Sequence, residues 1–354
     1  MTLGLVYDDE YLKHEHTPTH PERKERLQYT MDQLAEEGLL DDPGVEVVAP
    51  EGATNEQLER VHTDDYLERL RSMSASGSGM LSVDTHISAH TWEVAKLAAG
   101  GVAIALTGVA TGEYDSSFVM ARPGGHHAFA NDAHGFCYLN NTAVGIRHLQ
   151  ATTDVDRVLI WDWDAHHGDG TQSIFYDDPS VLVMSTHQDG RTLFPGTGDE
   201  RDVGEGDGEG YNVNVPLPPK TGDAGYRQIV EEIFEPIAHQ YDPDLVFVEA
   251  GQDNHFTDPI TDLGVTAQGY VTLMEHARDA ADELADGDIV ASLAGGYGIE
   301  GGLPYTNLAV IATLLGYETD AIREPAVYEA PSYDPDVSDV LRRVKHVQSA
   351  YWDL

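Results

Sequence analysis

Residues 158–170 read VLIWDWDAHHGDG, and this stretch is the most informative in the chain. Its first residues are apolar and rich in strand formers, so we expect a buried strand there. Because alternate side chains of a strand share a face, Asp162, Asp164 and His166 tend to point the same way. Two carboxylates and an imidazole suit a borderline cation such as zinc, with a position left for water. A solvated turn is the alternative, since Asp and Gly favour turns.

Length and composition indicate a globular protein. The chain has 354 residues, 41% of them hydrophobic, so it can bury a substantial core. The first residues lack the basic and cleavage signals of a secreted protein, and no uninterrupted apolar stretch reaches about eighteen residues. The single cysteine, Cys137, excludes an internal disulfide. We therefore expect no membrane segment and a cytoplasmic location.

The chain is strongly acidic, with a formal net charge of −42. Its carboxylates are spread from Asp8 to Asp353 instead of forming one acidic tail, which favours adaptation to molar salt and a halophilic source. An acidic surface that attracts a cationic partner is the alternative. Direct binding to nucleic acid is not expected, because the phosphate backbone would be repelled.

Strand-like and helix-like segments alternate along the chain. This alternation predicts an α/β fold with a doubly wound parallel sheet, in a single domain over residues 1–354. We expect its core over about residues 3–316 and a peripheral C-terminal appendage over about 324–354. The expected strands are residues 3–7, 118–121, 158–161, 181–186, 245–249 and 289–293, and the expected helices are 92–108, 142–150, 226–241 and 267–285.

Polar residues follow five of these strands at their carboxyl ends, where parallel sheets form binding sites. Asp253 follows the strand at 245–249 and is the natural third ligand beside Asp164 and His166. An exposed loop aspartate is the alternative reading. Tyr297 follows two glycines after the last expected strand, so its phenol can donate to a developing oxyanion or simply pack.

Two adjacent histidines, His126 and His127, follow the strand at 118–121. By themselves they could be plain loop residues. Asp162 and Asp169 flank the candidate ligands, and each can accept an N–H from one imidazole, which fixes its tautomer and raises its basicity. Water activated by a metal needs such a base within hydrogen-bond reach.

Further motifs extend this constellation along most of the chain. They are residues 20–23 (HPER), 61–66 (VHTDDY), 122–127 (RPGGHH), 135–141 (GFCYLNN), 162–170 (DWDAHHGDG), 194–198 (FPGTG) and 295–297 (GGY). From about residue 7 to 307 the chain resembles the zinc-dependent histone deacetylase superfamily, which includes acetoin-utilisation proteins and acetylpolyamine amidohydrolases. The resemblance implies an arginase-like fold, with a central parallel sheet and helices on both faces.

Carried over position by position, the resemblance makes Asp164, His166 and Asp253 the ligands of one Zn²⁺ per chain. A site with two carboxylates is only moderately selective, so Fe²⁺ or Co²⁺ could replace zinc. The resemblance also makes His127 the general base and later the acid, oriented by Asp169.

The same resemblance implies the supporting residues. His126 becomes an electrostatic histidine paired with Asp162, and Tyr297 polarises the scissile carbonyl. Arg26 sits near an expected internal exit for acetate. The substrate tunnel for an acyl-lysine side chain is assigned to Phe136, Phe194, Gly135 and Gly295. A buried monovalent-cation site, usually potassium, corresponds to Asp162, Ser185 and the backbone at Asp164, His166 and Thr186.

One segment departs from the family pattern. Gln252 stands where relatives usually carry a small or aromatic residue, which bears on the shape of the pocket. His255 is an extra imidazole that we expect to support the site or its rim, not to bind the metal.

The expected activity is removal of acetyl groups from lysine side chains of proteins. The same chemistry on acetylated polyamines or another small amide is the alternative, so the partner is an acetyl-lysine protein or a small acetylated amine. A non-catalytic acyl-lysine binding protein is less consistent with the presence of His126, His127 and Tyr297. A binuclear manganese ureohydrolase would need more Asp and His ligands at a second strand end. Nothing in the sequence indicates the oligomeric state.

Overall fold

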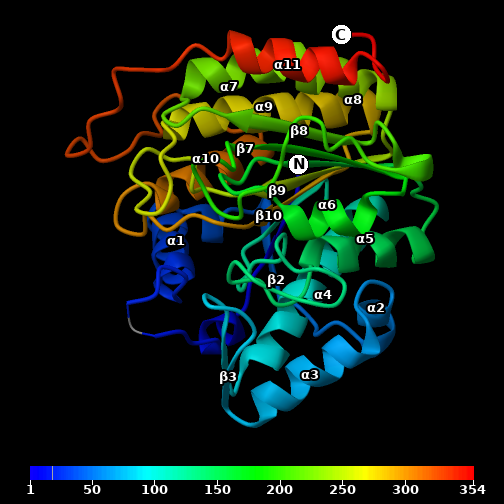
Figure 1. Cartoon of the computed structure of the whole chain (residues 1–354). Coiled ribbons are helices and arrows are strands. Elements are labelled where there is room, and N and C mark those ends of the chain that lie inside the picture. The colour runs from blue at the N-terminus through cyan, green and yellow to red at the C-terminus, as the bar shows by residue number, and fades with distance from the viewer. Residues whose placement is uncertain (18) are drawn as a thin grey trace.

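The computed structural model describes residues 1–17 and 19–354, and these form a central eight-stranded sheet with helices on both faces (Figure 1). All eight strands run parallel, in the order β2-β1-β5-β10-β9-β6-β7-β8. The predicted parallel α/β architecture is confirmed. The strands are β1 (Leu3–Val6), β2 (Val45–Val48), β5 (Ser116–Val119), β6 (Val158–Asp162), β7 (Val181–Gln188), β8 (Asn212–Leu217), β9 (Leu245–Ala250) and β10 (Ile289–Leu293).

The helices form two layers that enclose the sheet (Figure 1). One layer contains α1 (Glu25–Glu36), α7 (Asp223–Ile229), α8 (Glu235–Tyr241), α9 (Ala267–Leu284), α10 (Leu303–Leu314) and α11 (Ser338–Gln348). The other contains α4 (Thr91–Ala110), α5 (Asn141–Thr152) and α6 (Asp169–Phe175). Beyond that second layer lie α2 (Asn55–Glu59), α3 (Asp64–Ala75) and the antiparallel hairpin of β3 (Ser78–Met80) and β4 (His86–Ser88).

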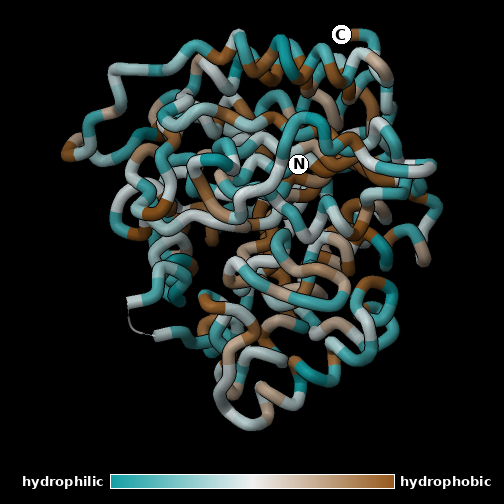
Figure 2. The backbone as a smooth tube through the Cα atoms, viewed as in Figure 1, coloured by the Kyte–Doolittle hydropathy of each residue, from teal (hydrophilic) through white to brown (hydrophobic). Residues whose placement is uncertain are grey.

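Burial on both faces explains why the central strands are mostly apolar. In β6, Leu159 and Trp161 pack against the layer that contains α9, whereas Val158 and Ile160 pack against α4 and α5. In a parallel sheet covered on both sides, residues of both faces lie against helices, so the strands contain nearly continuous apolar runs. Each such side chain contributes about 1.5–3 kcal/mol by its removal from water. Figure 2 shows the hydrophobic residues gathered in the central strands and hydrophilic ones along the outer loops.

The two edge strands, β2 and β8, were not predicted. β2 is short and only partly buried, so its pattern gives a weak signal. β8 contains Pro216, which an edge strand tolerates because one side of its backbone needs no partner. β5 begins at Ser116, two residues before the expected strand, and the Ser117 hydroxyl donates to the carbonyl of Gly4 (2.6 Å). Because Ser116 and Ser117 are polar although they are buried, the sequence pattern did not predict this start.

The helix expected over 226–241 is interrupted. Between α7 and α8 the chain forms a wide π-helical segment over Val230–Phe234. Pro236 lies in the first turn of α8. Since proline has no N–H and crowds the preceding turn, a local change of helical pitch accommodates it.

Helix α4 confirms the helix expected over residues 92–108. Among the described residues, α4 is the one helix long and apolar enough to cross a membrane by composition, but 67% of its apolar window is buried inside the fold. It is therefore explained as a core helix of the second layer. The segment expected to be a peripheral appendage contributes α11, whose Val340, Leu341 and Val344 are buried in the main hydrophobic core beside β8.

Candidate active site

The carboxyl ends of neighbouring strands bring the candidate residues together. β6 lies beside β9, β9 beside β10, and β10 beside β5. The loop after β6 carries Asp164 and His166, the loop after β9 carries Asp253, and the loop after β10 carries Tyr297. Since parallel strands end at one edge, residues far apart in the sequence meet there.

Asp164, His166 and Asp253 form a buried three-residue cluster. Nδ1 of His166 lies 2.9 Å from Oδ2 of Asp253 and 3.1 Å from Oδ1 of Asp164. Burial lowers the pKa of His166, but hydrogen bonds and charge from the two carboxylates outweigh it and raise the pKa to about 10. The centre of the cluster therefore requires a cation, either a proton or a metal ion.

The donor set fits a divalent metal. One ligand atom from each residue lies within 4.8 Å of the others. Two carboxylate oxygens and one imidazole nitrogen are the ligands of an open three-ligand zinc site, and they also accept iron(II) or cobalt(II).

The surrounding backbone fixes both carboxylates. The N–H of Ala165 donates to Oδ1 of Asp253 (2.9 Å), and the N–H of Gly295 donates to Oδ2 of Asp164 (2.6 Å). A Cβ added at Gly251 would collide with the Asp164 side chain, and one at Gly295 would collide with the carboxylates of Asp253 and Asp164. Both loops therefore need glycine to come this close to the cluster.

Two histidine–aspartate pairs lie next to the cluster. Nδ1 of His126 is 3.0 Å from Oδ2 of Asp162, and Nδ1 of His127 is 2.8 Å from Oδ1 of Asp169. All four side chains are buried, and the two imidazole rings are 4.0 Å apart between centroids. These contacts engage Nδ1 of each histidine and leave Nε2 as its other nitrogen, the arrangement that a carboxylate partner imposes on a catalytic imidazole.

The two histidines differ in electrostatics. Burial and the nearby His126 lower the pKa of His127 to about 3, although Asp169 acts in the opposite direction. His126 is also buried, but the charges of Asp164 and Asp162 raise its pKa well above the ordinary value. One ring thus favours the neutral form and its neighbour the charged form.

His134 is a site residue that the sequence did not reveal. Its Nε2 lies 2.9 Å from Oδ2 of Asp169, in a charge contact on the opposite oxygen from the one facing His127. Its ring also packs edge-on against Phe194. The only sequence signal was its place directly before the GFCYLNN motif, so a pairing between distant loops could not be inferred.

Tyr297 is held through its backbone. Its N–H donates to Oδ2 of the buried Asp258 (2.7 Å), and Gly296 before it adopts a left-handed conformation with φ of 119°. The guanidinium of Arg26 lies 4.8 Å from the centre of the phenol ring. Burial raises the pKa of Tyr297 well above its usual value, so the phenol keeps its proton.

A cavity of about 290 Å³ opens onto these groups. Phe136 and Phe194 form apolar parts of its wall. Gly135 at the same wall has φ of 58°, and an added Cβ there would strike the ring of His127. The remaining lining residues are Pro21, Asp84, His126, His127, His166, Leu193, Ile260 and Tyr297. Gly295 lies instead at a small internal space lined also by Arg26, Cys137 and Tyr297.

Comparison with known proteins identifies the family. Residues 20–314 match the histone deacetylase domain. The chain belongs to the histone deacetylase family. It is 47% identical to a probable deacetylase of Archaeoglobus fulgidus over 99% of each chain. It is 38% identical to a histone deacetylase-like amidohydrolase of Pseudomonas aeruginosa, over 86% of this chain and 78% of that protein.

A solved deacetylase domain has the same fold. The crystal structure of the HDA15 HD domain matches with a TM-score of 0.89 and 32% identity, covering 99% of this chain and 95% of that one. The predicted arginase-like deacetylase fold is therefore confirmed.

In this deacetylase-family chain, the Arg26 side chain hydrogen-bonds the backbone around the small internal space. Its Nε donates to the carbonyl of Gly296 (2.6 Å) and its Nη2 to that of Ala294 (2.5 Å). Nη1 lies 3.3 Å from the carboxylate of Glu22, which also makes a paired contact with Arg122. The arginine therefore anchors the glycine loop that precedes Tyr297.

Asp162 and Ser185, the side chains predicted for a monovalent cation, occupy paired positions on β6 and β7. Oδ1 of Asp162 accepts the N–H of Asp164 (3.0 Å), and the Ser185 hydroxyl lies 2.8 Å from Nδ1 of His187. Thr186, predicted to contribute through its backbone, is buried next to Ser185. The potassium site stays a prediction.

The two departures from the family pattern do not join the cluster. Gln252 is buried and donates from Nε2 to Asn307 (3.2 Å). His255 lies 2.9 Å from Glu324 and 2.9 Å from the Thr257 hydroxyl, through its two ring nitrogens. His255 thus links the loop after β9 to the segment after α10, and its contacts are structural.

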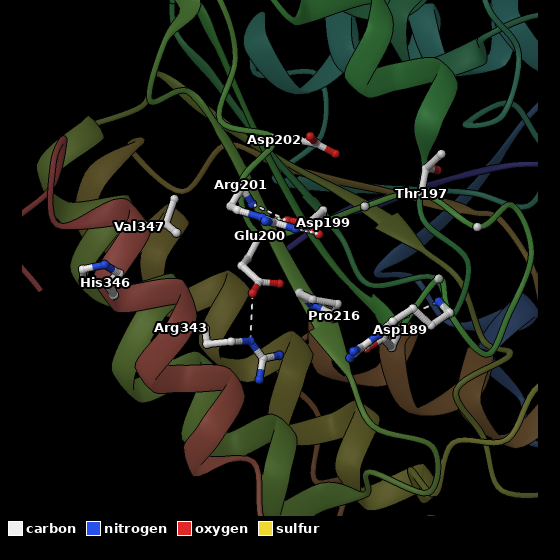
Figure 3. A pocket seen from close by; sticks show the side chains of 14 residues that line it. Asp189, Thr197, Asp199, Glu200, Arg201, Asp202, Pro216, Arg343, His346 and Val347 are labelled. Atoms are coloured by element: carbon white, nitrogen blue, oxygen red, sulfur yellow. Dashed lines mark hydrogen bonds and ion pairs between the residues drawn. The ribbon is translucent and has the colours of Figure 1, made fainter.

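Another cavity, about 740 Å³ in volume, lies elsewhere, beside β8 and α11 (Figure 3). Arg191, Arg201 and Arg343 line it, but each pairs with an acidic side chain of the same wall. None of the candidate ligands lines this cavity. The smaller cavity, which His166 of the three-residue cluster lines, is therefore the candidate active site.

Proposed function

We propose that this chain is a zinc-dependent amidohydrolase that removes acetyl groups from lysine side chains of proteins. One observation carries the proposal: His126, His127, His166 and Tyr297 line the same cavity, and His166 belongs to the buried three-residue cluster that fits a metal ion. Ligand, base and phenol thus face a common space in which an amide can react.

Asp164, His166 and Asp253 would hold the metal ion. When bound, zinc supplies a Lewis acid that polarises a carbonyl and favours deprotonation of water. Iron(II) or cobalt(II) would supply similar chemistry to the same ligands.

His127 would act as the base. Asp169 accepts the Nδ1 proton of His127, so Nε2 carries a lone pair and can take a proton from the attacking water. The lowered pKa keeps this imidazole neutral before reaction. The resulting imidazolium, or His126, then protonates the leaving amine. Asp162 holds His126 in position.

Tyr297 would stabilise the oxygen of the scissile carbonyl. Its phenol keeps its proton and can donate to that oxygen as negative charge develops. Phe136 and Phe194 would flank the aliphatic stem of the substrate lysine, because their rings form apolar walls of the cavity. The chemistry thus acts on an amide at the end of a long alkyl chain.

The proposal also covers a bound monovalent ion and the salt conditions around the protein. We propose a structural potassium ion near Asp162 and Ser185, and a cytoplasm of high salt as the setting of the acidic chain. Direct nucleic-acid binding is not part of the proposal, because the net charge of −42 opposes it.

One assay separates protein lysine from small amides as substrate. Wild-type protein in molar potassium chloride is given acetyl-lysine peptides and, in parallel, acetylated polyamines. The proposal predicts a higher kcat/KM for the peptides, with Tyr297→Phe as the control of strongly lowered kcat. A preference for polyamines would assign a small-amide substrate, and binding of peptide without turnover would make the chain an acyl-lysine binding protein.

A further inference from the structure

The segment between α10 and α11, residues 315–337, is fixed to helix α9. Nε2 of Gln268 on that helix donates to the carbonyls of Thr319 (2.9 Å) and Ile322 (3.0 Å). The segment lies beyond residues 20–314, the part of the chain that matches the histone deacetylase domain. Any contact that it makes with the candidate site is therefore made by residues outside the matched domain.

Glu324 of this segment forms a nearly buried pair with His255. Nε2 of His255 lies 2.9 Å from Oε1 of Glu324, and the two side chains are 1% and 10% exposed. Nδ1 of His255 accepts the N–H of Thr257 (3.3 Å), so the ring proton lies on Nε2 and is donated to the carboxylate. The same carboxylate oxygen accepts the N–H of Ala267, the first residue of α9. Glu324 thus joins the loop after β9 to the start of α9.

The surroundings of Glu324 keep its carboxylate charged. Burial acts to raise its pKa, but the hydrogen bonds from His255 and Ala267 outweigh this effect and lower the pKa. A hydrogen bond to an ionised carboxylate is stronger than one between neutral groups. Loss of either partner would also leave a buried polar group unpaired. The pair therefore resists displacement of the loop.

The position of His255 connects this pair to both halves of the site. Asp253, a proposed metal ligand, precedes it by two residues. The carbonyl of His255 accepts the N–H of Asp258 (2.8 Å), whose carboxylate accepts the N–H of Tyr297 (2.7 Å). An added Cβ at Gly302 would lie 2.1 Å from the His255 ring, so the ring fills the space in front of α10. Displacement of this ring would move the ligand and the phenol together.

From these contacts we infer that Glu324 and His255 act as a positioning pair for the candidate active site. They fix the loop that carries Asp253 and, through Asp258, the backbone of Tyr297. Neither side chain touches the substrate or the metal ion. The inference rests on the proposed metal-dependent function, and adds that the C-terminal segment helps to set metal affinity and turnover.

The zinc affinity of the folded chain tests this inference. Zinc bound to the wild type and to each variant is measured by equilibrium dialysis in chelator buffers, and the zinc bound by Asp253→Ala is subtracted. Glu324→Ala should raise the Kd of the remaining zinc about tenfold, the lower end of what loss of a supporting partner costs. Glu324→Gln should stay close to the wild type, because its amide oxygen can accept both N–H groups.

A matched control removes the same kind of pair elsewhere. The carboxylate of Glu235 on α8 lies 2.8 Å from Nδ1 of His276 on α9, outside the candidate site. Glu235→Ala should therefore leave the Kd for zinc unchanged. Circular dichroism and thermal unfolding check that each variant is folded at the temperature of the binding measurement.

Kinetics separate positioning from a purely structural role. With zinc at saturation, kcat of Glu324→Ala for an acetyl-lysine peptide should also fall about tenfold, while KM changes little. A loss of stability alone would lower Tm and leave the Kd and kcat of the folded protein unchanged. His255→Phe keeps a ring against Gly302 but loses both hydrogen bonds, so it should give the same changes, and it decides alone if Glu324→Ala does not fold.

The possible failures point to different conclusions. Unchanged Kd and kcat in Glu324→Ala and His255→Phe, beside an active wild type, would overturn the inference and leave the proposed function standing. An equal loss in Glu235→Ala would mean general destabilisation, and would overturn the inference as well. A wild type that binds no more zinc than Asp253→Ala would contradict the proposed function itself, and the inference with it.

Discussion

Oδ1 of Asp169 lies 2.8 Å from Nδ1 of His127, and the other carboxylate oxygen lies 2.9 Å from Nε2 of His134. Asp169 opens helix α6, where the partial positive charge of the helix N-terminus favours a carboxylate. Its two histidine partners help to hold the pKa of Asp169 below the usual range, against the effect of burial. The carboxylate therefore stays charged and fixes one tautomer of His127.

Asp169→Asn should lower kcat strongly while leaving bound metal unchanged. The amide can present an N–H to Nδ1 and so turn a protonated Nε2 toward the cavity, and loss of the correct base costs about 10² to 10⁴ in rate. Steady-state turnover of an acetyl-lysine peptide with metal analysis checks this. Asp132→Asn, at an exposed surface ion pair, is the control. Normal kcat in Asp169→Asn would remove the orienting role.

Gly295→Ala should reduce metal content and activity together. The added Cβ would collide with the carboxylates of Asp253 and Asp164, so one of the proposed ligands has to move. Gly52→Ala is a matched control, because its nearest neighbour would be an ordinary 3.8 Å away. The measurement that checks this is the number of zinc ions bound per chain after dialysis, in both variants. Full zinc occupancy in Gly295→Ala would show that the loop can shift to accept the added Cβ without loss of the metal site.

Tyr297→Phe should lower kcat by about 10² to 10³, because one oxyanion donor is removed while the ring keeps its packing. KM should change little, since the donated hydrogen bond strengthens in the transition state. Steady-state kinetics and thermal unfolding are measured beside Tyr333→Phe, a change at an exposed ring. Near-normal kcat combined with a lowered Tm would make Tyr297 a packing residue.

His62 provides a pH test away from the metal cluster. It is buried, its Nδ1 donates to the carbonyl of Phe129 (3.1 Å), and its Nε2 accepts the N–H of Asn140 (3.0 Å). Burial lowers its pKa to about 4, so the neutral ring stabilises the fold above the unfolded-state pKa near 6.5. This stabilisation is lost as the pH falls from about 6.5 toward 4, because the unfolded chain binds the proton first.

The destabilisation caused by His62→Gln should therefore shrink by about 2 kcal/mol between pH 7.5 and pH 5. Urea unfolding at constant salt gives the free energy of unfolding of both proteins at each pH. His90→Gln, at an exposed histidine, corrects for general effects. An equal penalty at both pH values would mean that His62 does not titrate as its surroundings suggest.

The central strands could be predicted because burial on both faces leaves a continuous apolar run, as in β6. The edge strands could not, since β2 is half exposed and β8 carries asparagines and Pro216. The C-terminal helix α11 was not predicted, for a related reason. Its apolar stripe is evident only with β8 beside it.

The candidate site shows the same division. The sequence predicted Asp164, His166 and Asp253 as metal ligands because their residue types, and their positions after expected strands, can be read directly from it. His134 and Asp258 were missed, because their importance lies in partners that only the fold supplies, at Asp169 and at the backbone of Tyr297.

The central claim is that turnover depends on a metal held by Asp164, His166 and Asp253. The most direct measurement is kcat for an acetyl-lysine peptide in molar potassium chloride, before and after chelator dialysis and after zinc is returned. We predict that chelation abolishes turnover, that zinc restores it in the wild type, and that Asp253→Ala stays inactive. Full turnover by the metal-free protein, or by Asp253→Ala, would contradict the account.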